Sequence, residues 1–205
     1  MASVTQRAPL INTLALLCCG IFLALLLTGR LGWAAYTAGF IPARLGGAAL
    51  VGALPVWLTP LSSALLHGGL LHLGINMLMM VFLGRQLEPA FGRRGLALLL
   101  IIGAYAGALL HWAVDPGSTT PVVGASGAIS ALVAAFAFIF NRDNVRGIGP
   151  FPPVVVRAAW LAAAWIGVQL ATGIAFGGGI AIFSHIGGFL AGLLLTRPLL
   201  RWRFR

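Results

Sequence analysis

The stretch "VVGASGAISALVAAFAFIF", residues 122–140, runs for 19 residues without a charged side chain. About 20 consecutive apolar residues are enough for a helix to cross the hydrocarbon core of a bilayer. Ser126 lies among small residues near the start of this stretch. Small side chains let membrane helices pack closely, whereas a serine hydroxyl can also serve as a nucleophile. The Gly-x-Ser-Gly pattern is weak by itself, so the rest of the chain must decide between these interpretations.

The apolar character extends over the whole chain. Of its 205 residues, 60% are hydrophobic and 8% are charged, whereas about a quarter of the residues of a soluble domain are charged. The sequence therefore predicts an all-α membrane protein: a compact bundle of six transmembrane helices in one domain, 1–205, with no separate soluble domain. The six apolar segments lie at about 10–29, 61–83, 95–114, 122–140, 154–174 and 179–196. The first segment is long for a signal peptide, which favours a retained anchor.

The charge pattern predicts how the bundle is oriented. The formal net charge is +10, and all 13 basic residues are arginines that lie in connections, which argues against a nucleic-acid surface. Eleven of them lie in the N-terminus, in 84–94, in 141–153 with the adjoining Arg157, and in the tail from Arg197, and the other two are Arg30 and Arg44. Because cytoplasmic loops carry the basic excess, we expect both termini in the cytoplasm. The absence of lysine beside abundant alanine, glycine and arginine fits a GC-rich bacterial genome, so we expect a bacterial inner (plasma) membrane protein.

The connection 30–60, on the opposite side, is long and holds four aromatic residues. Aromatic side chains favour the headgroup layer of a bilayer. We therefore expect this connection to lie on or partly in the outer leaflet. Its aromatic residues are Trp33, Tyr36, Phe40 and Trp57.

A few polar side chains interrupt the apolar segments at matching depths. They are His72 and Asn76 in the second segment, Ser126 in the fourth and His185 in the sixth. Counted from the cytoplasmic ends of these segments at 1.5 Å per residue, their depths agree within about 10 Å. All three segments run in the same direction, so these groups are predicted to meet in the outer half of the bilayer. Ionisable side chains inside a membrane are costly and indicate a functional site.

Glycine spacing in the sixth segment supports this convergence. Gly188 and Gly192 are four residues apart, so they share one helical face just after His185. A glycine strip lets another helix approach closely, and the small residues around Ser126 offer a matching surface. We therefore expect the helix over 179–196 to pack against the serine-bearing helix.

Neither a metal site nor a catalytic carboxylate is predicted at this depth. His67 and His72 are five residues apart, off a common helical face, and the chain has no His-Glu-x-x-His pattern. The acidic residues all lie near predicted connections: Glu88, Asp115 and Asp143. A nucleophilic Ser126 would thus act with a histidine alone, as a dyad. His72, Asn76 and the Ser126 backbone N–H could then supply oxyanion donors.

Four motifs follow one another along the chain: His-x-x-x-Asn at His72 and Asn76, Gly-x-x-x-Glu-x-x-x-Gly at Gly84, Glu88 and Gly92, Gly-x-Ser-Gly at Gly124, Ser126 and Gly127, and His-x-x-Gly-x-x-x-Gly at His185, Gly188 and Gly192. Together they resemble the rhomboid family of intramembrane serine proteases over about residues 61–196. The resemblance implies Ser126 as the nucleophile and His185 as the base, with no cofactor. It also implies His72 and Asn76 as oxyanion stabilisers. The chain departs from the family pattern at Ser130, where an aromatic residue is frequent, and it lacks a Trp-Arg pair in the outer connection.

The leading hypothesis is a serine-type endopeptidase that hydrolyses peptide bonds in or beside the transmembrane helices of other membrane proteins. Its expected partners are transmembrane protein substrates and the lipid bilayer, and not nucleic acid. The alternative is a catalytically silent rhomboid-like protein that binds membrane helices in a chaperone or sorting role. A small transporter would also explain intramembrane histidine and asparagine, but not their match to three protease motifs.

Overall fold

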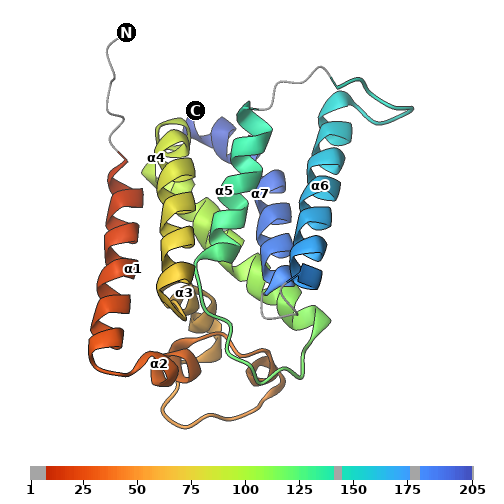
Figure 1. The fold of residues 1–205 in the computed structure, drawn as a ribbon. Helices are drawn as coiled ribbons and strands as arrows, with labels where there is room; N and C mark the ends of the chain where they lie inside the picture. Colours follow the sequence, from red (N-terminus) through yellow and green to blue (C-terminus); the bar gives the residue numbers. More distant parts are fainter. Residues whose placement is uncertain (1–7, 141–144, 176–180, 205) are drawn as a thin grey trace.

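The computed structural model describes residues 8–140, 145–175 and 181–204, and every regular element within them is a helix. Figure 1 shows the long helices side by side in one bundle, with the short helices α2 and α3 gathered at one end. The predicted all-α class is confirmed. The elements are α1 (Pro9–Leu27), α2 (Leu31–Ala38), the 3₁₀ helices η1 (Pro42–Gly46) and η2 (Val56–Leu58), α3 (Thr59–Leu65), α4 (Leu70–Val114), α5 (Ser126–Phe140), α6 (Pro153–Ala175) and α7 (Ile182–Arg203).

The longest helix, α4, bends at Gly92 (φ 67°, ψ 164°), which divides its 45 residues into two legs. Figure 1 shows the first leg (yellow) running up the bundle and the second leg (green) returning behind α5 and α7. Glycine adopts a positive φ without the clash of a side chain, so the bend falls on this residue. The predicted connection over 84–94 is therefore too long, because both legs stay helical up to the bend at Gly92. Leu87 and Phe91, each 0% exposed, hold these turns in the core.

The Gly-x-x-x-Glu-x-x-x-Gly motif joins α1 to this part of α4. The two carboxylate oxygens of Glu88 accept hydrogen bonds from the backbone N–H groups of Leu10 and Ile11, each at 3.1 Å. The first N–H groups of a helix lack acceptors within the helix and form the positive end of its dipole, so this carboxylate caps α1. A Cβ on Gly84 would overlap the Ile11 side chain, so this glycine makes room for α1.

The predicted helix over 61–83 starts too early. α3 ends at residue 65, and α4 begins only at Leu70. Two consecutive glycines, Gly68 and Gly69, fall in the break, and glycine disfavours helical conformation. His67 consequently lies in the turn between two helices rather than on a helix.

The predicted helix over 122–140 also starts too early, since α5 begins at Ser126 itself. The residues just before the serine are extended. Phe40 N–H donates to the Val122 carbonyl at 3.0 Å, and Val122 N–H donates to the Phe40 carbonyl at 2.7 Å. Gly124 has a φ of 120°, which no helix contains. Pairing with the outer connection thus replaces the first turn of the expected helix.

The other helix ends differ less from the predictions. α1 and α6 begin and end within two residues of the segments 10–29 and 154–174. α7 extends past the predicted end at 196 to Arg203, because arginines in its last turn complement the negative end of the helix dipole. Its predicted start at 179 lies outside the described residues.

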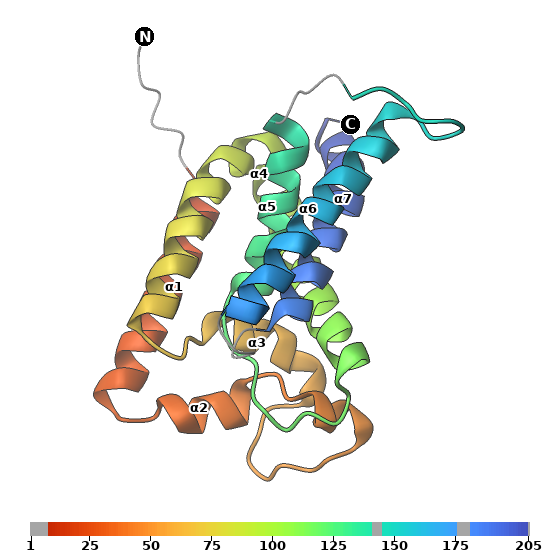
Figure 2. The ribbon, with the colours of Figure 1, turned by 45° about the vertical axis from the view of Figure 1, so that its right-hand side comes forward.

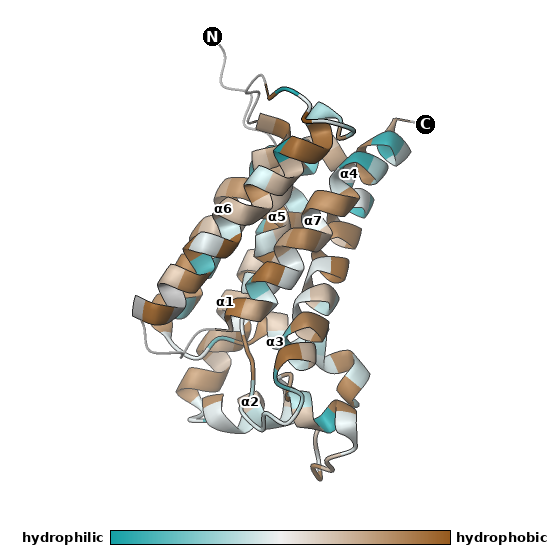
Figure 3. Cartoon of the chain, turned by 90° about the vertical axis from the view of Figure 1, so that its right-hand side faces the viewer, coloured by the Kyte–Doolittle hydropathy of each residue, from teal (hydrophilic) through white to brown (hydrophobic). Residues whose placement is uncertain are grey.

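Among the described residues, four helices are long and apolar enough to cross a membrane: α1, α4, α6 and α7. α5 is shorter, at 15 residues. Figure 3 shows hydrophobic colouring along most of the length of these helices. Large apolar side chains also point outward, and each of the following is at least 67% exposed: Leu16, Leu27, Leu71, Trp160 and Leu194. Such an outer surface fits lipid, as an integral membrane protein requires.

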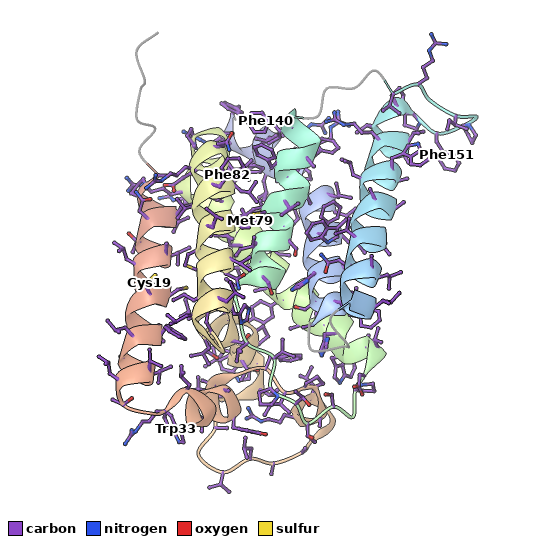
Figure 4. All side chains as sticks on the ribbon, viewed as in Figure 1. Cys19, Trp33, Met79, Phe82, Phe140 and Phe151 are labelled. Carbon is purple, nitrogen blue, oxygen red and sulfur yellow. The ribbon has the colours of Figure 1, made fainter. Side chains whose placement is uncertain are left out.

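The connection over 30–60 forms one end of the molecule, where Figure 4 labels Trp33. Trp33, Tyr36 and Trp57 are more than half exposed there, as headgroup-layer residues should be. The same expectation for Phe40 is wrong, because this residue is 1% exposed. Its backbone pairs with Val122, which draws its ring into the bundle.

Candidate active site

Three helices bring their first turns together on one side of the bundle. The first leg of α4, α5 and α7 all run in the same direction in Figures 1 and 2. His72 is the third residue of α4, Ser126 is the first of α5, and His185 is the fourth of α7. The side chains that the sequence predicts at one depth of the membrane therefore belong to the first turns of three helices that run in the same direction.

Ser126 and His185 are in hydrogen-bond contact. The Ser126 Oγ lies 2.8 Å from His185 Nε2. This distance is within the reach that a general base needs to accept a proton from a nucleophile. Because Ser126 opens α5, its own N–H is among those that have no acceptor within the helix. A serine with a base and a free N–H beside it can attack a carbonyl and stabilise the resulting oxyanion.

Glycines set the separation between the helices that carry this pair. A Cβ on Gly188 would overlap the carbonyl oxygen of Gly127, the residue after Ser126. A Cβ on Gly192 would lie 2.5 Å from the Ala131 carbonyl oxygen and 2.7 Å from its Cα. The predicted packing of the histidine helix on the serine helix is confirmed, and it is a contact of backbone on backbone.

The second leg of α4 closes on the same contact from behind. A Cβ on Gly103 would lie 2.7 Å from the Ala131 Cβ in α5. A Cβ on Gly107 would lie 2.6 Å from the Ser184 carbonyl oxygen in α7. The serine and histidine helices are thus each fixed against a third helix, so neither can shift without disturbing α4.

His72 and Asn76 face the residues that lead into Ser126. A Cβ on Gly124 would lie 2.7 Å from His72 Nε2 and 3.7 Å from Asn76 Nδ2. Asn76 is 5% exposed, and its Nδ2 donates to the His72 carbonyl at 3.0 Å. An amide nitrogen carries two hydrogens, so one donor of Nδ2 is left over from the bond to His72. The structure therefore brings both predicted oxyanion groups to the segment that ends in the serine.

Two backbone contacts hold that segment in place. One is the Phe40–Val122 pair described above. The other joins Gly124 N–H to the Ser63 carbonyl in α3 at 2.9 Å. The position of the serine is thus fixed by the outer connection as well as by its own helix.

A third polar group reaches the pair from α6, and sequence reasoning missed it. The His185 Nδ1 lies 2.8 Å from the Gln169 Oε1. Gln169 lies in the fifth apolar segment and belongs to none of the four motifs, so neither depth counting nor motif spacing pointed to it. A signal was present nonetheless, since Gln169 is a long polar side chain inside an otherwise apolar run.

Ser130 and His67 do not join the pair through their side chains. Ser130, one turn after Ser126, donates its hydroxyl to the Ser126 carbonyl at 2.8 Å. His67 is 3% exposed, and its ring centroid lies 5.3 Å from that of His72. Neither ring nitrogen of His67 has a hydrogen-bond partner within the described part of the chain.

A helical membrane protein with a serine and a histidine in contact at the ends of two closely packed helices matches a known family. Residues 54–202 match the family model described as the Rhomboid domain. The chain belongs to the rhomboid family, and the predicted resemblance is confirmed.

Similar proteins occur in plants and bacteria. RHOMBOID-like protein 4 of Arabidopsis thaliana is 34% identical over 141 residues, which are 68% of this chain and 33% of that protein. Rhomboid protease GlpG of Yersinia pestis (strain Pestoides F) is 27% identical over 197 residues, which are 94% of this chain and 63% of that protein. The chain thus spans about a third of the plant relative and less than two thirds of GlpG.

Proposed function

We propose that this protein is an intramembrane serine endopeptidase that hydrolyses peptide bonds in or beside the transmembrane helices of other membrane proteins. The observation that carries the proposal is the 2.8 Å contact between Ser126 Oγ and His185 Nε2. Membership of the rhomboid family and the similarity to a protein named rhomboid protease GlpG support it.

The proposed reaction has two steps that use the same pair. His185 Nε2 accepts the hydroxyl proton while Ser126 Oγ attacks the scissile carbonyl carbon. The tetrahedral intermediate collapses as the histidine returns the proton to the leaving amine, and the C–N bond breaks. Water then attacks the acyl-serine ester by the same route, which releases the carboxylic acid and restores the serine hydroxyl.

The negative charge of the tetrahedral intermediate needs hydrogen-bond donors. We assign this role to His72, Asn76 and the Ser126 backbone N–H. The position of both side chains against Gly124 supports the assignment, since that residue lies two positions before the nucleophile. Donors already in place cost no reorganisation during the reaction, which makes such groups a large part of catalysis.

The substrate segment must unwind before it is cut, because a helix keeps its carbonyls in its own hydrogen bonds. We therefore expect substrates with glycine or proline near the membrane face where the site lies. The whole chain would act as a single domain, residues 1–205. α5 together with α1, the two legs of α4, α6 and α7 would make six crossings.

We infer that both termini are cytoplasmic and that the protein lies in a bacterial plasma membrane. The distribution of arginines supports this orientation. Arg85, Arg94, Arg157 and Arg201 belong to the end of the bundle where α4 bends, where α6 begins and where α7 ends. Cytoplasmic ends carry such an excess, and Ser126 and His185 would then lie toward the outer face.

The test uses the purified full chain in detergent with a fluorescent transmembrane substrate that carries glycine or proline near its outer end. Ser126→Ala and His185→Ala should each lower the cleavage rate at least about a thousandfold, because among the described residues no second nucleophile or base is hydrogen-bonded to the pair. Thermal unfolding in the same detergent checks that both variants remain folded. Cleavage by Ser126→Ala at more than a few per cent of the wild-type rate would contradict the proposal. Wild-type protein that binds the substrate without cutting it would favour the silent, helix-binding alternative.

A further inference from the structure

Gln169 stands out on the least buried of the long helices. α6 lies at the edge of the bundle beside α7 in Figures 1 and 2. Among its residues whose burial the structure describes, only Val156 and Gln169 are buried, and Gln169 is 6% exposed. Burying an amide in an apolar environment costs free energy unless the amide is hydrogen-bonded. The burial of Gln169 therefore needs a partner, and that partner is His185.

The geometry determines which atom carries the proton. The atom 2.8 Å from His185 Nδ1 is the amide oxygen of Gln169, and an amide oxygen can only accept. With the amide oxygen facing the ring, Nδ1 is assigned as the protonated nitrogen. In a neutral imidazole the other nitrogen is then an acceptor. That nitrogen, Nε2, is the one that lies 2.8 Å from the Ser126 hydroxyl.

We propose that Gln169 is a positioning residue for His185: its amide oxygen holds the imidazole in the tautomer and orientation that let Nε2 accept the proton of Ser126. This inference rests on the proposed function. The amide does not take up the proton itself. It acts as the orienting carboxylate does in a serine–histidine–aspartate triad, through the hydrogen bond to Nδ1.

The choice of a neutral group follows from the surroundings. A carboxylate at this depth would place a charge in an apolar region, which is costly for a membrane protein. An amide provides the same acceptor atom without the charge. The described acidic residues, Glu88 and Asp115, belong to other parts of the bundle: one caps α1 and the other follows the end of α4.

A second side chain of α6 supports the same arrangement. Trp165 lies four residues before Gln169, so both share one helical face. The Trp165 indole N–H donates to the His185 carbonyl at 3.4 Å. Its ring stacks on Phe189 of α7 with centroids 5.1 Å apart. α6 thus contacts His185 at both its ring and its backbone.

The first experiment measures cleavage kinetics for the full chain in detergent. Gln169→Leu should lower kcat by roughly 10- to 100-fold, as expected for loss of an outer hydrogen-bond partner, with KM changed less than about twofold because ground-state binding is untouched. The matched control is Gln86→Leu, since within the described part of the chain the Gln86 amide donates to the Phe82 carbonyl of its own helix and to no other group. This variant should cleave like wild type.

Gln169→Glu separates positioning from packing. It keeps an acceptor for Nδ1, so it should recover most of the activity that Gln169→Leu loses. A carboxylate there stabilises the imidazolium, so the acidic limb of the pH–rate profile should move to higher pH. Equal losses in Gln169→Leu and Gln169→Glu, with no change in the pH profile, would overturn the proposal and leave Gln169 a packing residue.

The second experiment reads the tautomer directly and does not require cleavage. In ¹⁵N-histidine-labelled protein, the signals that disappear in His185→Ala belong to His185. Wild type should show a protonated Nδ1 and an unprotonated Nε2, and Gln169→Leu should show a mixture of both tautomers. If wild type cleaves no substrate but this difference is present, the proposed function fails and the positioning contact stands. If Gln169→Leu leaves the His185 signals unchanged, the inference fails whatever the cleavage assay shows.

Discussion

α7 packs against α5 and against α6 in different ways. Against α5 it packs backbone on backbone, because Gly188 and Gly192 leave no side chain between the helices. Against α6 it packs through long side chains: Gln169 reaches the His185 ring, and Trp165 stacks on Phe189. The first contact sets the distance from histidine to serine, and the second sets the direction of the imidazole. A change at the contact between α7 and α5 should therefore displace the base, whereas a change at the contact between α7 and α6 should reorient it.

This division has an energetic reason. Between helices in lipid there is little hydrophobic driving force, so close van der Waals packing and interhelical hydrogen bonds hold them together. Glycine contacts allow the closest packing of two helices. They therefore help to keep Ser126 Oγ and His185 Nε2 within about 3 Å of each other, as proton transfer requires. Interhelical hydrogen bonds are directional, which suits an orientation.

The largest effect should come from breaking the α5 contact. In Gly188→Val the new Cβ overlaps the Gly127 carbonyl oxygen, so α7 must move away from the serine helix. A displacement near 1 Å can cost about a hundredfold in rate, so cleavage should fall at least that much although glycine has no chemistry of its own. The thermal unfolding temperature should fall as well. The measurement is cleavage and thermal unfolding of the variant in one detergent.

Gly46→Val is the matched control for this prediction. Gly46 is exposed, has no positive φ and has no heavy atom within 4 Å of an added Cβ. The same change of residue should therefore leave both cleavage and unfolding close to wild type. Wild-type cleavage by Gly188→Val would show that the glycine contact does not set the separation of Ser126 and His185.

A smaller effect is expected from a change at Asn76, which takes part neither in the contact of α7 with α5 nor in that of α7 with α6. Asn76→Ala should lower kcat by roughly 10- to 1,000-fold and not abolish it, because His72 and the Ser126 N–H would remain as oxyanion donors. KM should stay nearly constant, since the lost donor acts on the transition state. Steady-state kinetics of the purified variant check this. An unchanged kcat would reassign Asn76 to the hydrogen bond with the His72 carbonyl alone.

The two contacts also differ in how far the sequence predicts them. Glycines four residues apart are a periodic signal, so the packing of α7 on α5 could be predicted. Gln169 has no periodic or motif partner in the sequence, and only the fold brings it to His185 across 16 positions. The all-helical class and the convergence of Ser126 and His185 followed from apolar length and depth counting. The choice of Gln169 as the orienting group could not be predicted in this way.

Helix boundaries were predicted less well, for local reasons. Most of the connection expected over 84–94 is helical, because the side chains of Leu87 and Phe91 are fully buried in the core of the bundle. Hydropathy alone does not show that a segment flanked by arginines is buried in this way. The start of α5 at Ser126 depends on the pairing of Phe40 with Val122, two residues 82 positions apart. Contacts at that separation have no signature in a single sequence, yet this one puts the serine at the N-terminus of its helix.

The smallest effect on activity should come from the opposite end of α6. The Arg157 guanidinium, about three turns before Gln169, donates to the Ala137 carbonyl at 3.1 Å and to the Phe138 carbonyl at 2.6 Å. These bonds attach α6 to the end of α5, far from His185. Arg157→Met removes them, which should cost about 1 kcal/mol and lower the unfolding temperature by about 2–4 °C. Cleavage should stay within about twofold of wild type, because the contact at His185 is intact.

Arg146→Met is the control for this prediction, because it changes an exposed arginine at the same end of the bundle. It should alter neither the unfolding temperature nor the cleavage rate. If Arg157→Met instead loses as much kcat as Gln169→Leu, α6 moves as a rigid unit, and orientation of the imidazole depends on the whole helix rather than on one amide.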